Sequence, residues 1–310
     1  MIRRPRSLIA ALLAIPLVSA ACGSAPPDAR ADETVIPDQT GEARERVILV
    51  TGSTGGLGRE VARRLASGGA HVIVHGRDRE RGLDLVREIE EGGVGSARFY
   101  AADFGSLANV RRLAEAVRRD YDRLDVLVNN AGILMSPNRR PVSDDGYELH
   151  FQVNYLAGFL LTRLLLPLLE ESAPARIVNV SSRSSAALDF DNLMLERGYS
   201  TSRAYGQSKL AQVMFTLDLA ERLEGTGVTV NALHPATLMP TDLVLEYGMR
   251  PRDSIEDGVE AVLNLIDTPE AGSGHYYNGL ERARSHAQAY DPAVRARLRE
   301  VSEELTGLSG

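Results

Sequence analysis

Cysteine is almost absent from this chain. Cys22 is the only one among 310 residues, so an intrachain disulfide is impossible and a zinc site built from several cysteines is excluded. No metal site is predicted. Tryptophan is missing, and 42 acidic residues outnumber 35 basic ones, which gives a net charge of −7. Nucleic-acid-binding proteins normally carry clustered basic surface, so no nucleic-acid partner is predicted.

Lysine is nearly absent as well. Of the 35 basic residues, 34 are arginine, and Lys209 is the single lysine. A GC-rich coding bias explains the arginines. A lysine that survives such a bias is expected where a compact, titratable ammonium is needed and a planar guanidinium cannot serve. The alternative is chance survival.

The first 21 residues differ in composition from the rest. Three arginines precede an apolar run from Leu8 to Val18, and small residues lead up to Cys22. The run is too short for a membrane span, which takes about 20 apolar residues. This order predicts a lipoprotein-like signal peptide over residues 1–21 and a flexible tether over residues 22–45. The protein is therefore expected to be exported and anchored to a membrane by a lipid on Cys22.

Two alternatives to this lipid-anchored localisation stay open, and the export route is open as well. Ser19 stands where a lipoprotein signal prefers leucine, so ordinary cleavage near Ala20 or Ala21 is one of them. Arg3-Arg4 suggests twin-arginine export of a folded protein, although the flanking residues fit that signal poorly. A mis-assigned start codon would leave a cytoplasmic protein that begins near Arg44.

From Arg46 onward, short apolar runs alternate with helical patterns. The expected strands are 47–50, 71–74, 97–101, 126–128, 176–180, 228–233 and 275–277, and the expected helices are 57–67, 80–91, 107–121, 147–169, 203–223 and 255–265. Several strands are apolar at consecutive positions, as expected when helices cover both faces of a sheet. The alternation predicts one α/β domain over residues 46–308, with a Rossmann-type, doubly wound parallel sheet.

A glycine-rich turn joins the first expected strand to the first expected helix. It reads Thr51-Gly52-Ser53-Thr54-Gly55-Gly56-Leu57-Gly58. Glycines let a backbone approach a pyrophosphate, and a helix N-terminus adds free N–H groups and a positive dipole end. A purely structural turn is the alternative, since such a motif is weak alone. Its place between strand and helix favours a dinucleotide site.

Tyr205 and Lys209 lie four residues apart on an expected helix and so project from the same face. A tyrosine hydroxyl has a pKa of about 10, which a neighbouring ammonium lowers. Tyr205 is therefore expected to give a proton to a carbonyl oxygen or take one from an alcohol. The alternative is an ordinary helical pair. Ser182 follows the strand 176–180, at the edge where open parallel sheets bind ligands.

The second expected strand ends at Val74-His75-Gly76-Arg77. NAD-binding proteins usually place an acidic residue near this point to hold the ribose hydroxyls, whereas an arginine accommodates the 2′-phosphate of NADP. Because Gly76 replaces the acidic residue and Arg77 follows, NADP is the predicted cofactor, with NAD as the alternative. The competing interpretation is that Arg77 faces only solvent.

Several segments together resemble the short-chain dehydrogenase/reductase family. They are the glycine-rich turn, Asp103, Asn129-Asn130-Ala131-Gly132 and Tyr205-Gly206-Gln207-Ser208-Lys209. The resemblance covers nearly all of the chain after the tether, and Phe151-Gln152-Val153-Asn154-Tyr155-Leu156 is similar to the retinol-dehydrogenase-like branch. It implies an NAD(P)-dependent oxidoreductase that moves a hydride between a nicotinamide cofactor and an apolar carbonyl or alcohol substrate.

The resemblance also implies which residues form the site. The expected catalytic residues are Asn154, Ser182, Tyr205 and Lys209; Ser182 bonds the substrate oxygen, and Asn154 holds a proton-relay water through a backbone kink. The expected cofactor contacts are Gly52, Ser53, Thr54, Gly56, Leu57, Gly58, Arg77, Asp103, Phe104, Asn130, Ala131, Gly132, Tyr205, Lys209, Pro235 and Thr237. A homo-oligomer paired through the helices around Asn154 and after Tyr205 is expected too.

The segment after the sixth strand departs from the family pattern. The family typically has Pro-Gly there and a threonine five residues after the proline, whereas this chain has Pro235-Ala236 and then Pro240. Thr237 and Thr241 are both candidates for the nicotinamide amide. The apolar residues beyond form either a lid over the substrate or one helix face packed on the core. They are Leu238, Met239, Leu243, Val244, Leu245 and Tyr247.

A non-catalytic dinucleotide-binding sensor or scaffold is the alternative function, since a fold alone does not establish turnover. Such a protein has no need of Asn154, Ser182, Tyr205 and Lys209 together. Their co-occurrence favours an enzyme.

Overall fold

The structure is a computed structural model that describes residues 45–134, 139–246 and 248–308. The expected signal peptide, nearly all of the expected tether and the expected lipid anchor at Cys22 lie outside the described residues. Tyr247 lies outside them as well.

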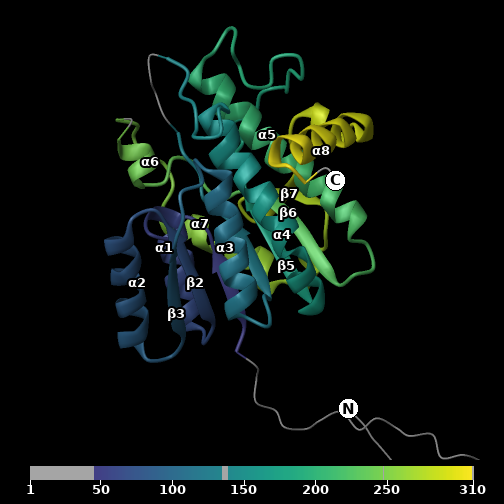
Figure 1. The fold of residues 1–310 in the computed structure, drawn as a ribbon. Coiled ribbons are helices and arrows are strands. Elements are labelled where there is room, and N and C mark those ends of the chain that lie inside the picture. The colour runs from purple at the N-terminus through teal and green to yellow at the C-terminus, as the bar shows by residue number, and fades with distance from the viewer. Residues whose placement is uncertain (1–44, 135–138, 247, 309–310) are drawn as a thin grey trace, which may run out of the picture. The chain divides into compact units, whose positions relative to one another are not determined.

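One eight-stranded sheet organises the described residues, in the order β3-β2-β1-β4-β5-β6-β7-β8 (Figure 1). Its strands are β1 (Val47–Val50), β2 (His71–Gly76), β3 (Ser96–Ala101), β4 (Val126–Asn129), β5 (Ala175–Val180), β6 (Val228–His234), β7 (His275–Asn278) and β8 (Glu281–Ala283). Neighbours are parallel up to β7, and β8 is antiparallel to β7. The winding reverses between β1 and β4, which makes the switch point where such sheets bind ligands. The predicted doubly wound fold is confirmed, with β8 as the departure.

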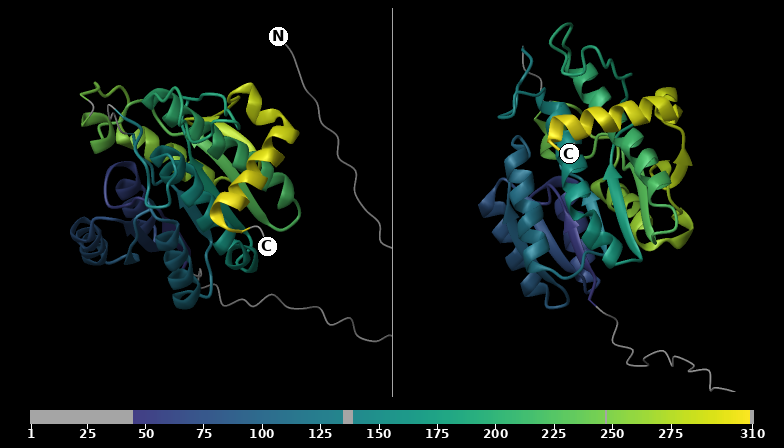
Figure 2. Two further views of the ribbon diagram at one scale, coloured as in Figure 1. Left: turned by 45° about the horizontal axis from the view of Figure 1, so that its top comes forward. Right: turned by 45° about the vertical axis from the view of Figure 1, so that its right-hand side comes forward.

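Helices cover both faces of the sheet (Figure 2). The helices α1 (Gly56–Ser67), α2 (Arg79–Gly92) and α7 (Ile255–Asp267) contribute to one apolar cluster, and α3 (Leu107–Asp120), α4 (Ala157–Glu171), α5 (Thr201–Arg222) and α8 (Pro292–Thr306) contribute to another. Successive residues of a strand point to opposite faces, so Ile48 and Val50 enter the first cluster and Leu49 the second. Two covered faces explain the consecutive apolar residues of β1.

The helix that carries Asn154 is kinked. It passes through a π-helical turn, η1 (Phe151–Leu156), before it becomes α4. π-Turns are rare and occur mostly at functional sites, and the expected kink at Asn154 is present. In the described part of the chain, Phe151–Glu171 is the one helical segment long and apolar enough for a membrane span, and 67% of its apolar window is buried inside the protein.

The helix α8 packs on α5 and is not among the helices predicted from the sequence (Figure 1). Every residue of α5 from Gly206 to Ala220 is buried. Arg295 and Arg299 of α8 pair with acidic residues of α5, each at 2.5 Å. This corrects the expectation that two copies pair through the helix after Tyr205, because a helix of the same chain occupies its outer face.

Candidate active site

A cleft of about 840 Å³ opens at the carboxyl ends of β1 to β6. Its walls come from the glycine-rich turn, the loops after β2, β3, β4 and β5, one face of α5 and the segment after β6. Every residue expected to contact the cofactor lines it except Ser53. The position matches the binding edge of open parallel sheets.

The glycine-rich turn is locked against the loop after β4. Thr51 Oγ1 accepts hydrogen bonds from the N–H groups of Asn130 and Ala131, both at 3.0 Å. Asn130 Nδ2 donates to the carbonyl oxygens of Thr51 (2.9 Å) and Gly52 (3.2 Å). Gly52 has a φ of +64°, and a Cβ there would come within 2.8 Å of Ala131. A Cβ on Gly58 would lie 2.4 Å from Asn130 Nδ2, so the two motifs fit together only with glycine at both positions.

Ser53 lies beneath the cleft, which corrects its expected contact with the cofactor. Its buried hydroxyl donates to the Val50 carbonyl (2.7 Å) and accepts from the His75 N–H (3.0 Å). His75, to which sequence analysis gave no role, supports the same turn: its Nδ1 accepts from the Gly52 N–H (3.2 Å), and its Nε2 lies 3.2 Å from the Ala102 carbonyl oxygen. Burial lowers the pKa of His75 to about 4, so the ring is neutral near pH 7 and carries its proton on Nε2.

Arg77 and Asp103 flank the end of the cleft nearest β2 and β3. The Arg77 side chain is 69% exposed, and its Nη1 lies 3.9 Å from the Asp103 carboxylate. Phe104 stacks on His75 with 4.4 Å between ring centroids. Arg77 thus lines the cleft and remains free to turn toward an anion, as expected for a 2′-phosphate contact.

Arg81 also lines the cleft, and sequence analysis gave it no role. Its Nη1 pairs with Asp242 at 2.7 Å and thereby links α2 to the short helix α6 (Asp242–Leu245). A Cβ on Gly55 would lie 3.7 Å from Arg81 Nη1 and 4.0 Å from Asp242 Oδ2, and one on Gly56 would lie 3.1 Å from the Thr241 methyl group. The start of α6 is therefore docked on the glycine-rich turn.

Tyr205, Lys209 and Ser182 meet in the middle of the cleft. Lys209 Nζ lies 5.7 Å from the centroid of the Tyr205 ring and donates to the Val180 carbonyl (2.9 Å) and to Gln212 Oε1 (3.0 Å). Burial lowers the pKa of Lys209 to about 7. Burial raises the pKa of Tyr205, and a hydrogen bond with Ser182 opposes this rise.

The expected lowering of the Tyr205 pKa by Lys209 is thus wrong for this structure. The ammonium is directed toward Val180 and Gln212, and burial disfavours the charged phenolate. Tyr205 is therefore a protonated phenol near neutral pH.

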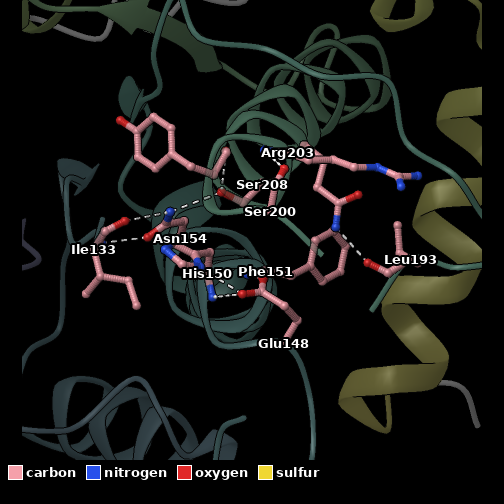
Figure 3. A network of polar contacts seen from close by, with 11 residues as sticks. Ile133, Glu148, His150, Phe151, Asn154, Leu193, Ser200, Arg203 and Ser208 are labelled. Atoms are coloured by element: carbon pink, nitrogen blue, oxygen red, sulfur yellow. Dashed lines mark hydrogen bonds and ion pairs between the residues drawn. The ribbon is translucent and has the colours of Figure 1, made fainter. Parts of the chain in front are cut away.

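Asn154 connects three elements of the structure (Figure 3). Its Oδ1 accepts from the Ile133 N–H (2.7 Å), and its Nδ2 donates to the Ile133 carbonyl (3.1 Å) and to Ser208 Oγ (3.0 Å). Ser208 in turn donates to the Tyr205 carbonyl (2.8 Å). Asn154 lies behind the cleft wall, and it fixes the loop after β4 and the kinked helix against α5.

The segment after β6 closes the cleft. Thr237 Oγ1 hydrogen-bonds with His234 Nε2 (3.1 Å). Thr237 and Thr241 both line the cleft, so both remain candidates for binding the nicotinamide amide. Of the possible lid residues, four line the cleft, namely Leu238, Met239, Leu243 and Val244. Leu245 is 53% exposed and is not part of such a lid.

Comparisons with known sequences identify relatives over most of the chain. Residues 46–249 match the family model of the short chain dehydrogenases. Human Retinol dehydrogenase 14 is 37% identical over 293 aligned residues, covering 85% of this chain and 87% of that protein. Human Retinol dehydrogenase 13 is 36% identical, with coverages of 85% and 85%.

Comparisons with solved structures also identify relatives over most of the chain. A protein from Mycobacterium paratuberculosis superposes with a TM-score of 0.68 and 32% identity, covering 84% of this chain and 93% of that one. The Pseudomonas aeruginosa RhlG/NADP active-site complex gives 0.63 and 29%, with coverages of 75% and 94%. A short chain dehydrogenase from Escherichia coli complexed with NADPH gives 0.63 and 28%, with coverages of 76% and 97%.

None of these relatives is described as a non-catalytic sensor or scaffold. Two of the three structures described above contain NADP or NADPH, in agreement with the predicted cofactor. The chain belongs to the short-chain dehydrogenase/reductase family, resembles its retinol-dehydrogenase-like branch, and is an NAD(P)-dependent oxidoreductase.

Proposed function

We propose that this protein is an NADP-dependent carbonyl reductase or alcohol dehydrogenase with Tyr205 as its acid–base group. The observation that carries the proposal is the meeting of Ser182, Tyr205 and Lys209 in one cleft. Apolar side chains also line the cleft, namely those of Leu134, Val153, Leu238, Met239, Leu243 and Val244. Such a lining suits a long apolar aldehyde or alcohol, and the names of the retinol dehydrogenases that the chain resembles point to the same substrate class.

The cleft fits a nicotinamide dinucleotide. A Cβ on Gly55 would contact only the ends of the Arg81 and Asp242 side chains, at 3.7 and 4.0 Å, so flexible side chains and not backbone border the start of α1, where a pyrophosphate would bind. A Cβ on Gly132 would lie 3.4 Å from Lys209 Nζ, so the bare glycine leaves room beside the ammonium. The turn would hold the pyrophosphate, Arg77 the 2′-phosphate, and Thr237 or Thr241 the nicotinamide amide. The bound cofactor supplies or accepts the hydride.

The side chains of the protein transfer the proton and stabilise the charges that develop. In reduction, the Tyr205 hydroxyl gives its proton to the carbonyl oxygen, which becomes the alcohol hydroxyl. Because the pKa of Tyr205 is raised, the hydroxyl carries this proton near neutral pH. Ser182 hydrogen-bonds the substrate oxygen as negative charge develops there. To stabilise the phenolate that remains, the Lys209 ammonium would turn toward Tyr205 from the Val180 carbonyl and Gln212, which hold it in this structure. In oxidation these steps are reversed, and Tyr205 takes the proton from the alcohol hydroxyl.

The test is Tyr205→Phe, assayed with NADPH and retinal, medium-chain aldehydes and ketones. Loss of a general acid lowers turnover by at least about 100-fold, while NADPH binding, followed by fluorescence, is retained. Tyr100→Phe is the control, because its hydroxyl bonds Asp120 at 2.7 Å outside the cleft. Near-normal turnover of Tyr205→Phe would exclude the assigned role. NADPH binding by the natural protein without turnover of any carbonyl or alcohol would favour the sensor.

We propose further that the protein is exported and anchored through a lipid on Cys22. The order of basic, apolar and small residues before the only cysteine supports this. The test is fractionation of cells that express the natural protein or Cys22→Ala. Recovery in the membrane fraction that is lost in the variant is the expected result. An uncleaved, soluble full-length protein would contradict it.

We also infer a homo-oligomer, since members of this family usually assemble. The coverage of α5 by α8 argues for an interface elsewhere on the chain. Light scattering coupled to gel filtration measures the mass in solution, and a monomer at all concentrations would contradict the inference.

A further inference from the structure

A second recess, of about 230 Å³, adjoins the catalytic cleft and is lined mainly by polar groups. Its wall includes the cationic or titratable side chains of Arg183, Arg284 and His286, the hydroxyls of Ser185 and Ser285, and the amide of Asn278. None of the described residues that line it is acidic. Guanidinium and hydroxyl groups facing one small space are the donors that bind carboxylates and phosphates.

Arg183 connects this recess to the reacting centre. It follows Ser182 directly and lines both the recess and the catalytic cleft. Its charge helps to lower the pKa of His234 on the cleft side, and it opposes the burial that raises the pKa of Tyr276 on the recess side. Tyr276 Oη donates to the Ser182 carbonyl at 3.0 Å. A ligand in the recess would therefore lie close to Ser182.

The positive charge of the recess is not neutralised by the protein. Within the described ranges, neither Arg183 nor Arg284 has a carboxylate within ion-pair distance. Arg284 is held by its ring contact, with its guanidinium carbon 4.2 Å from the Tyr290 ring centroid, and Tyr290 Oη accepts from the Ser285 N–H at 3.0 Å. In a chain of net charge −7, a recess with two unpaired arginines favours an anion.

The cofactor does not supply this anion. Its phosphates are expected at the glycine-rich turn after β1 and at Arg77 after β2, whereas the recess lies around β7, β8 and the loop after β5. The sheet order separates β2 from β7 by four strands.

We propose that this recess binds the carboxylate or phosphate group of an amphipathic substrate whose apolar part lies along the lid. The proposal rests on the carbonyl reductase function and narrows its substrate class. Arg183 and Arg284 would hold the anionic group, while Ser182 and Tyr205 act on the carbonyl or alcohol.

Binding is tested first, without turnover. Octanoate, octyl phosphate, inorganic phosphate and octanol are titrated by calorimetry into the full-length protein loaded with NADPH, which cannot oxidise octanol. Because charge-assisted hydrogen bonds are the strong ones, we expect at least one amphiphilic anion to bind about tenfold more tightly than octanol. The tighter of the two anions identifies the head group. Equal binding of octanol and both anions would overturn the proposal, and so would inorganic phosphate binding as tightly as octyl phosphate, which marks a free-anion site.

Variants of the two recess arginines test where the anion binds. Arg183→Leu and Arg284→Ala should each remove most of the preference for the anion. Arg222→Ala is the matched control, because it removes the same charge from an exposed site at the far end of α5. A preference that survives both recess variants would overturn the assignment of the site.

Turnover then separates this proposal from the function on which it rests. Octanal and 8-oxooctanoate have the same chain length, and we expect kcat/KM about tenfold higher for the acid, with the ratio falling toward one in Arg284→Ala. Reduction of both with a ratio near one would overturn the anionic substrate and leave the reductase intact. Reduction of neither would count against the reductase, while the calorimetry still decides whether the recess binds anions.

Discussion

Arg77 tests cofactor choice at the level of a single residue. Only NADPH carries the 2′-phosphate that a guanidinium can hold with two hydrogen bonds. We expect Arg77→Ala to raise the Kd for NADPH by about tenfold or more and to change that for NADH little. Fluorescence titration measures both. Arg79→Ala is the control, because Arg79 is exposed nearby and does not line the cleft. Equal losses for the two cofactors would show that Arg77 is only a surface residue.

Lys209 links catalysis to stability. Its pKa is about 7 in the folded protein against an ordinary 10.5. Between these values the unfolded chain binds one more proton than the folded chain, so stability rises with pH across this window. Below pH 7 both states are protonated, and the full cost of burying the ammonium is present. Lys209→Met should therefore raise the denaturant midpoint most at pH 6, and the gain should shrink toward pH 10. A gain independent of pH would contradict this.

The site residues that could be predicted from the sequence are those that belong to local sequence patterns. The glycine-rich turn and the Tyr205–Lys209 spacing are local patterns, and the structure brings both to the cleft. The buried position of Ser53 and the role of His75 depend on contacts between the glycine-rich turn and β2, which are distant in sequence. The pKa of Tyr205 was misjudged for the same reason, because burial depends on the whole fold.

At the level of elements, the link between α2 and α6 ties the lid to the glycine-rich turn. The Arg81–Asp242 pair joins them at 2.7 Å with both side chains more than half exposed. Exposed ion pairs contribute about 0.2–1 kcal/mol, so we expect Asp242→Asn to raise the NADPH off-rate only two- to fivefold. Stopped-flow fluorescence measures this rate. The charge-swapped double variant, Arg81→Asp with Asp242→Arg, should restore most of it.

The control for this pair is Asp84→Asn, which removes a carboxylate of α2 that pairs with Arg87 away from the cleft. An off-rate unchanged in Asp242→Asn, or changed equally in Asp84→Asn, would show that the pair does not hold the lid.

Periodicity predicted the central elements well and the peripheral ones poorly. The buried strands and the helices that cover them have strong apolar patterns, and the expected helices end within one or two residues of those observed. β8 has three exposed or half-exposed residues, and α6 has only four residues, so neither leaves a pattern. α8 did carry signals, since Asp291 caps it, Pro292 begins it and Gly307 ends it in a left-handed conformation.

At the scale of the whole molecule, α8 supports the helix that carries the catalytic pair. Leu298 of α8 is 1% exposed within the same apolar cluster as α5, and Ser302 Oγ hydrogen-bonds with Tyr155 Oη at 2.7 Å. Truncation of a buried leucine costs about 2–5 kcal/mol. We expect Leu298→Ala to lower the free energy of unfolding by this amount, as measured by urea denaturation.

Leu298→Ala also tests whether α8 affects turnover as well as stability. Leu298 lines neither the cleft nor the recess, so its truncation should act on stability alone. At temperatures where Leu298→Ala is folded, we expect its kcat with a saturating aldehyde to stay within about twofold of that of the natural protein. Leu245→Ala is the matched control, since Leu245 is 53% exposed and its truncation should change stability by no more than about 0.5 kcal/mol. Equal stability of the two variants would mean that α8 is not part of the core. A large loss of kcat in stable, folded Leu298→Ala would mean that α8 sets the geometry of Tyr205 and Lys209 as well as their stability.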